Sequence, residues 1–412
     1  MAYLNVTKIE EALSQMKLRF QRKDSTVEMV DLEASLGRYL AKDLYATENL
    51  PSFRRSMVDG YAVLASDTLG ASEQSPMILQ VVGSVDIGCK SELNLTTGYA
   101  AYVPTGGEIP VGAEAMVMIE HTEALGPDIA IYYTATYGEN IVGIGEDVQE
   151  RTLILKKGTR LAPQHEAILA SLGYAEIPVV KKPKVFILST GDELVDVSST
   201  PGYGQVRDCN STIIRNIVES CGCEVVDSVR VIDEIEAFQK ALRNATVSAD
   251  VVILSGGSSA GIKDMTQLAI DSLAGNTDSP NVFIHGLAIK PGKPTVVGQI
   301  GEKPVIGLPG HPAACFITMK AFVEPFLNDF IGKNETEIRR IPCISGFQLH
   351  AAGGRDVYQL VEMVYEEEKL TAHILYGKSG MVSALAKANA YVVIKMNQEG
   401  IKVGDNLVAY LL

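Results

Sequence analysis

The chain has 412 residues, too many for a single hydrophobic core, so two to four domains are expected. Its 36 basic and 50 acidic residues give a net charge of −14, which argues against a nucleic-acid or anionic-membrane partner. No apolar run approaches the length of a membrane span, and the first residues lack the long apolar segment of a signal peptide. We therefore expect a cytoplasmic protein.

The N-terminal half changes from helical to strand-like patterns. Thr7–Glu10 has the spacing of a capping box and predicts the start of a helix. Asp31–Leu44 has apolar residues at helical spacing and predicts a second helical stretch. From Thr47 to Ile141, short alternating runs are separated by Gly and Pro, which is typical of a β-rich domain.

A helical residue pattern returns after this β-rich segment. Pro163 to Leu172 is predicted to be a helix, and Ile177–Lys184, with its two prolines, a linker. We therefore predict one discontinuous helical or linker domain over 1–46 and 142–182, interrupted by a β-rich insertion domain over 47–141.

Residues 183–332 alternate strands and helices. Strands are predicted at 185–188, 224–231, 251–254 and 304–308, and helices at 210–221, 233–245, 265–274 and 312–330. This alternation predicts an α/β/α three-layer sandwich with a parallel sheet. Residues 333–412 are strand-like again and predict a C-terminal β-barrel domain. The expected fold class is thus multidomain, α/β plus β.

Three loops that follow short apolar runs carry the chemistry. Ser189–Glu193 offers carboxylates, Ser255–Gly261 offers free backbone N–H groups, and Lys290–Pro294 offers two ammonium groups. Ligands of parallel sheets bind at the carboxyl ends of the strands, where we expect these loops to lie. Carboxylates hold hard cations, and converging N–H and ammonium groups hold anions. Together the loops favour a phosphorylated ligand bound with a divalent cation.

Each loop also has a purely structural interpretation. The glycine loop could be a tight strand-to-helix turn, and the lysine loop an exposed basic turn. Asp233, at the start of a predicted helix, could be an N-cap residue. A further segment rich in Arg, Ser and Asp, Pro51–Ala62, could be an ordinary surface loop.

A set of motifs nevertheless resembles the molybdopterin molybdenumtransferase family, which includes MoeA and the E domain of gephyrin. The motifs occur in the family's order and span almost the whole chain. They are Ser56–Ala62, Pro104–Gly107, Gly145–Asp147, Ser189–Leu194, Ser255–Gly261, Lys290–Pro294 and Gly307–Pro312. Three positions depart from the family pattern: Val58 interrupts the commoner spelling of the Ser56–Ala62 motif, His311 replaces an Asn, and Ala314 stands where many members have a Ser.

The resemblance implies a homodimer of four-domain subunits with an active cleft at the subunit interface. It implies that molybdate is inserted into adenylylated molybdopterin, with magnesium-dependent release of AMP. A molybdopterin adenylyltransferase would be a further partner. Two other interpretations remain: the chain could itself be such an adenylyltransferase, or a gephyrin-like scaffold without activity.

The resemblance also assigns site residues. Glu193, Asp233 and Asp264 would hold Mg²⁺, and Asp59 would reach in from the partner subunit as a further catalytic group. The residues implied to bind substrate are Thr105, Asp147, Thr190, Gly191, Gly256, Gly257, Ser258, Lys290, Lys293, Arg355 and Ser379. Within this group the two lysines, with Arg355 and Ser379, would neutralise the molybdate dianion.

Overall fold

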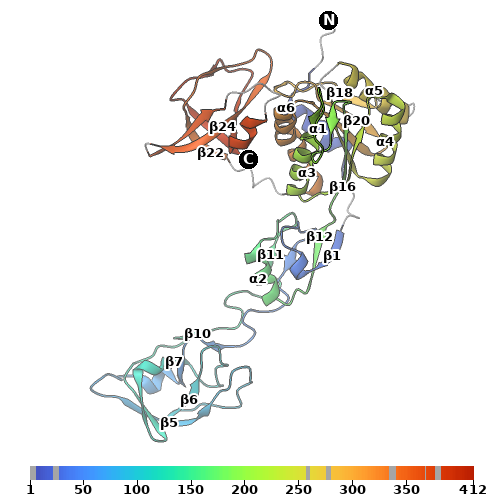
Figure 1. The fold of residues 1–412 in the computed structure, drawn as a ribbon. Coiled ribbons are helices and arrows are strands. Elements are labelled where there is room, and N and C mark those ends of the chain that lie inside the picture. Colours follow the sequence, from blue (N-terminus) through green and yellow to red (C-terminus); the bar gives the residue numbers. More distant parts are fainter. Residues whose placement is uncertain are drawn as a thin grey trace. The chain divides into compact units, whose positions relative to one another are not determined.

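A computed structural model describes most of the chain. The described residues are 6–21, 27–256, 260–274, 280–333, 340–366, 368–375 and 382–412, with the backbone alone for 260–264. The chain forms two compact units (Figure 1). One comprises residues 42–157 and 163–176, and the other comprises residues 1–41, 158–162 and 177–412.

The first unit is built around a six-stranded sheet. Its strand order is β7-β4-β6-β5-β9-β8. The bounds are β4 Gly60–Val63, β5 Met77–Ser84, β6 Tyr99–Val103, β7 Ala115–Met118, β8 Thr122–Leu125 and β9 Asp128–Ile131. Each face of the sheet packs a separate apolar cluster, one around Met116 and one around Val117, because side chains alternate along a strand. The β-rich segment predicted from Thr47 to Ile141 therefore contains a hydrophobic core of its own.

Gly60 is where this sheet is packed most tightly. It lies in β4 between β6 and β7, and a Cβ at this position would be 2.0 Å from the Val117 carbonyl oxygen. Any side chain would force the two strands apart, so this position in the Ser56–Ala62 motif must be Gly.

The rest of this unit consists of short elements beside the sheet. Two antiparallel pairs join segments that are distant in sequence, and a helix follows. The elements are β2 Leu44–Tyr45 with β11 Leu153–Leu155, β3 Arg55–Ser56 with β10 Ile141–Val142, α2 Pro163–Ser171, and the 3₁₀ turns Ala65–Thr68 and Ile119–His121.

The second unit contains a mixed sheet with the strand order β16-β13-β17-β21-β20-β18. The first four strands are parallel, and the last two are antiparallel to their neighbours. The bounds are β13 Lys184–Thr190, β16 Glu224–Val231, β17 Val251–Gly256, β18 Val282–Ile284, β20 Val296–Ile300 and β21 Lys303–Leu308.

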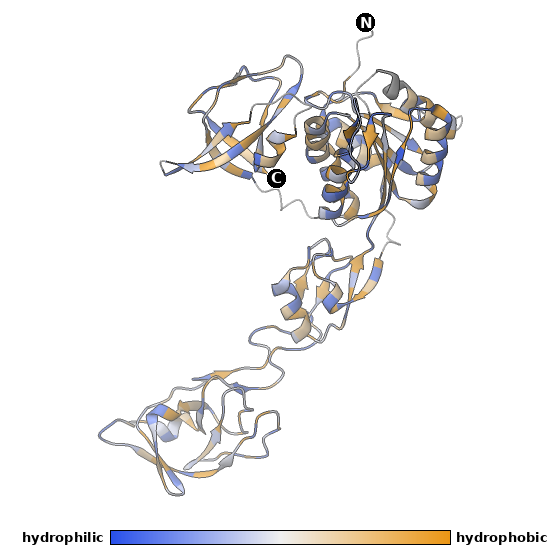
Figure 2. Cartoon of the chain, in the orientation of Figure 1, coloured by the Kyte–Doolittle hydropathy of each residue, from blue (hydrophilic) through white to orange (hydrophobic). Residues whose placement is uncertain are grey.

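Helices cover both faces of this sheet. The helices are α1 Ile9–Arg19, α3 Asn210–Ser220, α4 Ile235–Ser248, α5 Ala260–Ala274, α6 Pro312–Thr318 and α7 Glu324–Ile331. Val185 and Ile187 of β13 share a core with α1, α3, α6 and α7, whereas Phe186 and Leu188 share one with α4 and α5. The predicted α/β/α three-layer sandwich is therefore confirmed, and Figure 2 shows how apolar residues concentrate on its strands.

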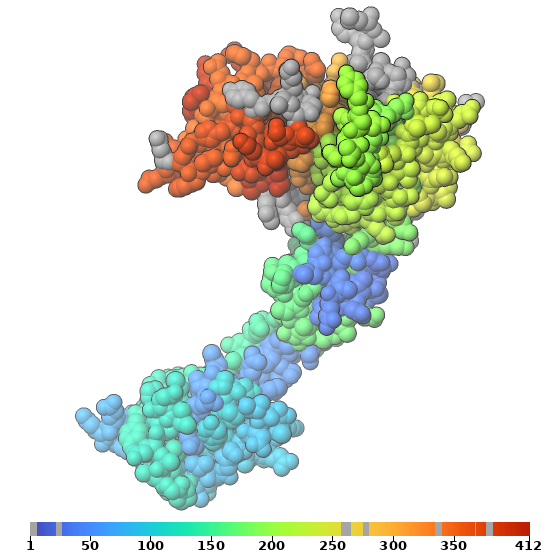
Figure 3. Space-filling view, viewed as in Figure 1, coloured from blue at the N-terminus to red at the C-terminus, as the bar shows by residue number. Residues whose placement is uncertain are grey.

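A β-barrel follows the sandwich, as predicted. Strands β24, β25, β22, β28 and β26 pair in that order, and β26 pairs back with β24 to close the ring. The bounds are β22 Arg340–Ser345, β24 Asp356–Glu366, β25 Lys369–Ile374, β26 Ala390–Ile394 and β28 Asn406–Leu411, with the pair β23 Leu349–His350 and β27 Gly400–Ile401 and the helix α8 Ser383–Lys387. The barrel, orange and red in Figure 3, packs on the sandwich through Tyr358, Leu360 and Tyr391.

A short strand, β19 Ile289–Lys290, ties the sandwich to the barrel. It runs parallel to β24, with Ile289 opposite Asp356. Lys395 adds a polar link, because its Nζ lies 2.7 Å from Asp356 Oδ2 and 2.9 Å from Glu10 Oε1 of α1. The N-terminal helix, β19 and the barrel are thus joined at one place.

Four local predictions were wrong or incomplete. Asp31–Leu44 is not a helix: one 3₁₀ turn, Leu32–Ala34, ends near Gly37, whose φ is 75°, and Tyr39 and Leu40 then make β-bridges. The predicted linker after Ile177 contains β12 Glu176–Val180, which pairs with β1 Val27–Asp31. In both segments the backbone pairs with residues that are distant in sequence. This tertiary pairing outweighs the helix or linker tendency of the local sequence.

The other two errors concern helix ends. Thr7 forms no capping box, because its backbone pairs with the Gly286–Ala288 segment instead and α1 begins without a side-chain cap. The single helix predicted over 312–330 is α6 and α7 separated by a π-helical turn, Met319–Val323. Pro325 follows this turn and has no N–H to donate, which explains the interruption.

No helix in the described ranges combines the length and the apolar composition that crossing a bilayer requires.

The tight packing at Gly60 gives a stability prediction. Gly60→Ala places a methyl group against the Val117 carbonyl and should cost about 2–4 kcal/mol of folding free energy in this unit. Thermal unfolding of the variant checks this. Gly353→Ala is the control, because a Cβ there meets nothing within 4 Å. Equal unfolding temperatures for the two variants would contradict the packing argument.

Candidate functional site

The candidate site lies along the side of the sandwich sheet where the parallel strands end. We call this row of carboxyl ends the edge of the sheet. The parallel strands β16, β13, β17 and β21 end at Val231, Thr190, Gly256 and Leu308, and parallel pairing places these ends on the same edge. Two of the three loops predicted to bind ligand, those after β13 and β17, begin at this edge. Sequence and topology therefore agree on where the chemistry is concentrated.

Carboxylates gather at the β13–β16 end of this edge. Thr190 pairs with Val231, so the Asp192 and Glu193 loop lies beside Asp233, whose N–H donates to Asp192 Oδ1 at 3.1 Å. Gly191 has a φ of 149°, and a Cβ there would lie 2.8 Å from Glu193 Oε2. Glycine thus allows the Glu193 carboxylate to fold back over the turn.

The environment of Asp233 disfavours its charged form. Partial burial, and then the negative charges of Asp192 and Glu193, raise the pKa of the Asp233 carboxyl. The nearby Thr190 hydroxyl lowers the pKa of Asp233, although it lacks the geometry of a full hydrogen bond to any described group. A bound cation would relieve the repulsion among the three carboxylates.

These residues fit magnesium better than a metal that needs a complete protein ligand set. Among the side chains that the structure describes, no three His, Cys, Asp or Glu are grouped closely enough to hold a metal. Magnesium, however, usually takes one or two carboxylates and completes its shell with water and substrate phosphates. Glu193 and Asp233 have the hard oxygen donors that such a site requires.

The middle of the edge is held by polar groups at the start of α3. Asp208 accepts a hydrogen bond from Ser189 Oγ at 2.7 Å, at the end of β13. Asn210 Nδ2 donates to Ser255 Oγ at 2.9 Å and to the Gly310 carbonyl at 2.8 Å. We name Asp208, Asn210, Ser189 and Ser255 the edge network. The sequence analysis did not single out Asp208 or Asn210, although polar residues that open a helix beside a sheet edge were a usable signal.

The lysine loop reaches this edge by a different route from the one predicted. The residues before it do not form a strand of the sandwich sheet, because β19 pairs with the barrel strand β24. The loop instead leads into β20, which is antiparallel to β21 and therefore begins at the edge where β21 ends, with Val296 opposite Gly307. Lys290 and Lys293 are thereby placed at the β20–β21 end of the edge.

Arg355 is brought to the lysine loop by the barrel. It directly precedes β24, and the Asp356 N–H donates to the Ala288 carbonyl at 2.9 Å. The Leu287 N–H in turn donates to the Lys293 carbonyl at 3.1 Å. Arg355 and the two lysines therefore come from segments that backbone hydrogen bonds join, and we call these three residues the basic end of the edge.

The acidic and basic ends are separated by a distance that suits an extended ligand. Neighbouring strands lie about 4.8 Å apart, so the three steps from β13 to β20 span about 14 Å. A ligand with phosphate groups at one end and an oxyanion at the other could lie along this edge.

The remaining described candidates belong to the other unit. The Thr105 N–H donates to Asp59 Oδ1 at 2.9 Å, so these two residues lie together. Asp147 is on a separate loop, where its N–H donates to the Leu50 carbonyl at 3.1 Å. Gly257, Ser258, Ser379 and the side chain of Asp264 lie outside the described part of the chain.

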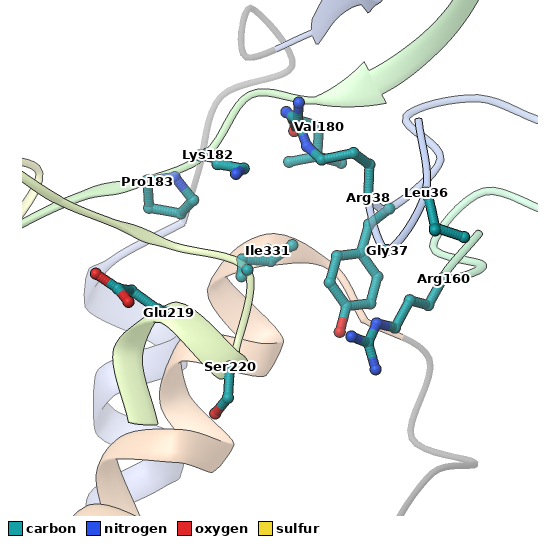
Figure 4. Close-up of a pocket in the computed structure, with 12 residues that line it drawn as sticks. Leu36, Gly37, Arg38, Arg160, Val180, Lys182, Pro183, Glu219, Ser220 and Ile331 are labelled. Atoms are coloured by element: carbon teal, nitrogen blue, oxygen red, sulfur yellow. Dashed lines mark hydrogen bonds between the residues drawn. The ribbon is translucent and has the colours of Figure 1, made fainter. Parts of the chain in front are cut away.

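A separate cavity lies near the opposite edge of the sheet. Its volume is about 220 Å³, and the lining residues include Tyr39, Arg160, Pro183 and Glu219 (Figure 4). Pro183 precedes β13 and Glu219 is at the end of α3, so this cavity is at the strand starts. It contains none of the predicted site residues.

Comparison with protein families gives three consecutive matches. Residues 7–173 match the MoeA N-terminal region (domains I and II), residues 186–329 match a probable molybdopterin-binding domain, and residues 343–412 match the MoeA C-terminal region (domain IV). The matches cover nearly the whole chain.

Individual relatives agree with these matches. A molybdopterin molybdenumtransferase of Bacillus subtilis is 33% identical, over 98% of this chain and 94% of its own length. One from Staphylococcus aureus is 31% identical, over 92% and 89%. The crystal structure of the molybdopterin biosynthesis MoeA protein from Pyrococcus horikosii superimposes with a TM-score of 0.85 at 32% identity, covering 99% of both chains.

Fold and site thus define a multidomain transferase of molybdenum-cofactor biosynthesis. The chain belongs to the MoeA family of molybdopterin molybdenumtransferases. The family predicted from the ordered motifs is confirmed, and so is the predicted fold class.

The raised pKa of Asp233 gives a pH-dependent prediction. A carboxyl whose pKa is higher in the folded chain than its ordinary value near 3.8 destabilises the fold once it ionises, and this cost is complete above the folded pKa. Asp233→Asn should therefore raise the unfolding temperature at pH 7, and the gain should shrink as the pH falls toward 4. Thermal unfolding across this range, without magnesium, is the measurement.

Asp271→Asn serves as the control for Asp233→Asn, because Asp271 is exposed on α5 outside the cluster. A gain for Asp233→Asn that is the same at every pH would show that charge repulsion is not its cause.

Proposed function

We propose that this protein inserts molybdate into adenylylated molybdopterin and releases AMP in a magnesium-dependent reaction. One observation carries the proposal: a single sheet edge has Asp192, Glu193 and Asp233 at one end and a basic group of Lys290, Lys293 and Arg355 at the other. Family membership supports the molybdenum chemistry. The separation of charge supports two substrates, one with a metal-bound phosphate and one that is a separate oxyanion.

The proposed roles follow from charge and position. Lys290, Lys293 and Arg355 neutralise the molybdate dianion and hold it near the molybdopterin dithiolene. Glu193 and Asp233 hold Mg²⁺ and orient the phosphates of the substrate. The bound ion would withdraw electron density from the phosphoanhydride that breaks when AMP leaves. The N–H groups of the loop that begins at Gly256 would contact substrate phosphates.

The other unit supplies the proposed partner contribution. Asp59 and Thr105 are already paired on one surface of that unit, and the proposal places them at the site of a second copy in a homodimer. Closed twofold dimers are the commonest soluble oligomers and create two equivalent shared sites. The match of all three family regions favours the insertase over a single-domain adenylyltransferase.

Loss of the Glu193 carboxylate should abolish the reaction. Glu193→Gln keeps the size of the side chain but removes the charge that holds the cation, so AMP release from adenylylated molybdopterin should fall at least about 100-fold. The assay follows AMP with magnesium, with and without molybdate. A scaffold without activity would release no AMP even as wild type, and AMP release that ignores molybdate would refute the insertase.

Sharing of the site between subunits gives a second test. Asp59→Asn and Glu193→Gln should each inactivate a homodimer, whereas mixed dimers contain one site with both wild-type residues. Co-expression of the two variants with different affinity tags, followed by tandem purification, isolates the mixed dimer. Recovery of AMP release is expected. If the mixed dimer stays as inactive as its parents, Asp59 and Glu193 do not act across subunits.

A further inference from the structure

The edge network at the start of α3 joins three strand ends. Asp208 is bonded to Ser189 at the end of β13, and Asn210 to Ser255 near the end of β17 and to Gly310 just after β21. β13, β17 and β21 are consecutive neighbours in the sheet. The ends of these three strands are therefore bonded to one three-residue segment, 208–210.

The side-chain hydrogen bonds of Asn210 do not cap α3, the helix that begins with this residue. Asp208 satisfies the helix start, because its carboxylate accepts from the Ser211 N–H at 3.0 Å and from the Ser211 hydroxyl at 2.6 Å. Asn210 is only 8% exposed, and its amide hydrogens go to Ser255 and Gly310, which are 45 and 100 residues away in sequence. The side chain therefore connects loops and does not act as a cap.

Two further polar atoms in this region are buried without a hydrogen-bond partner in the described part of the chain. They are Asn210 Oδ1 and Thr190 Oγ1. Such atoms are uncommon in folded proteins, and each calls for an explanation such as a ligand, an ion or a water. Asn210 belongs to the edge network and Thr190 ends β13, so both atoms lie at the proposed substrate edge.

We propose that Asn210 is a positioning residue for the substrate, an inference that rests on the proposed function. Its two hydrogen bonds hold Ser255, near the end of β17, at a fixed distance from Gly310, just after β21, and so fix the relative position of these two strand ends at the proposed substrate edge. In the proposed reaction, adenylylated molybdopterin and molybdate are held together along this edge. Loss of this spacing impairs productive alignment of the substrate, because small displacements at a reacting centre have large effects on rate.

Three variants test the proposal. Asn210→Ala removes both donors, and Asn210→Asp keeps the shape but replaces the amide by a carboxyl. Asn216→Asp is the matched control, because Asn216 is exposed on the same helix. The measurements are AMP release, binding of adenylylated molybdopterin through its pterin fluorescence, and the unfolding temperature. We expect Asn210→Ala to lower turnover at least about tenfold, at a temperature where the variant is fully folded.

The Asn210→Asp variant separates positioning from general stability. Its carboxyl would be buried beside Asp208, with Cys209 on the same segment, His311 on the Gly310 loop and Cys315 on α6 as the other ionisable groups nearby. Burial and the Asp208 charge keep such a carboxyl protonated to higher pH than usual. The protonated form can donate one of the two lost hydrogen bonds, so turnover should recover toward low pH relative to wild type.

The outcomes are distinguishable. Reduced turnover of Asn210→Ala, with low-pH recovery in Asn210→Asp and wild-type behaviour of Asn216→Asp, supports the proposal. Wild-type turnover and substrate affinity in Asn210→Ala would overturn it while leaving the insertase intact, as would an Asn210→Asp profile parallel to wild type. Wild-type protein that neither binds adenylylated molybdopterin nor releases AMP would overturn the proposed function and this inference together.

Discussion

The parallel pairing of β13 with β16 and β17, and of β17 with β21, is the constraint on which the rest of the site depends. Parallel strands end at the same edge, so residues from distant parts of the sequence meet there without a dedicated contact between them. Asp233 lies beside Glu193 for this reason. The strand β20 is antiparallel to β21, so the start of β20 lies at the same edge as the end of β21.

The ends of this edge have opposite character, and each is maintained by a different kind of interaction. At the acidic end, burial and the charges of Asp192 and Glu193 raise the pKa of Asp233, so the cluster favours a cation. At the basic end, backbone pairing through β19 and β24 places Arg355 beside the lysine loop. The barrel therefore contributes Arg355 to the proposed site.

The edge network lies between these ends and joins the ends of β13, β17 and β21. Its hydrogen bonds are short and buried, and in a surrounding of low polarity such bonds are strong and directional. The network holds the ends of β13 and β17 and the turn after β21 against the start of α3.

The sequence by itself determined the sandwich, the barrel and the β-rich insertion, because strand and helix periodicity are local properties. The order of its motifs along the chain determined the family and the loops with chemical groups. It did not determine the turns around Tyr39, the strand β12, or the membership of β19 in the barrel sheet, because backbone pairing with distant segments decided each of them. The edge network was also invisible: Asp208 and Asn210 are ordinary polar residues in sequence, and only the tertiary structure brings Ser189, Ser255 and Gly310 within hydrogen-bond distance of them. Local pattern specifies which elements form, whereas long-range hydrogen bonding decides which of them meet.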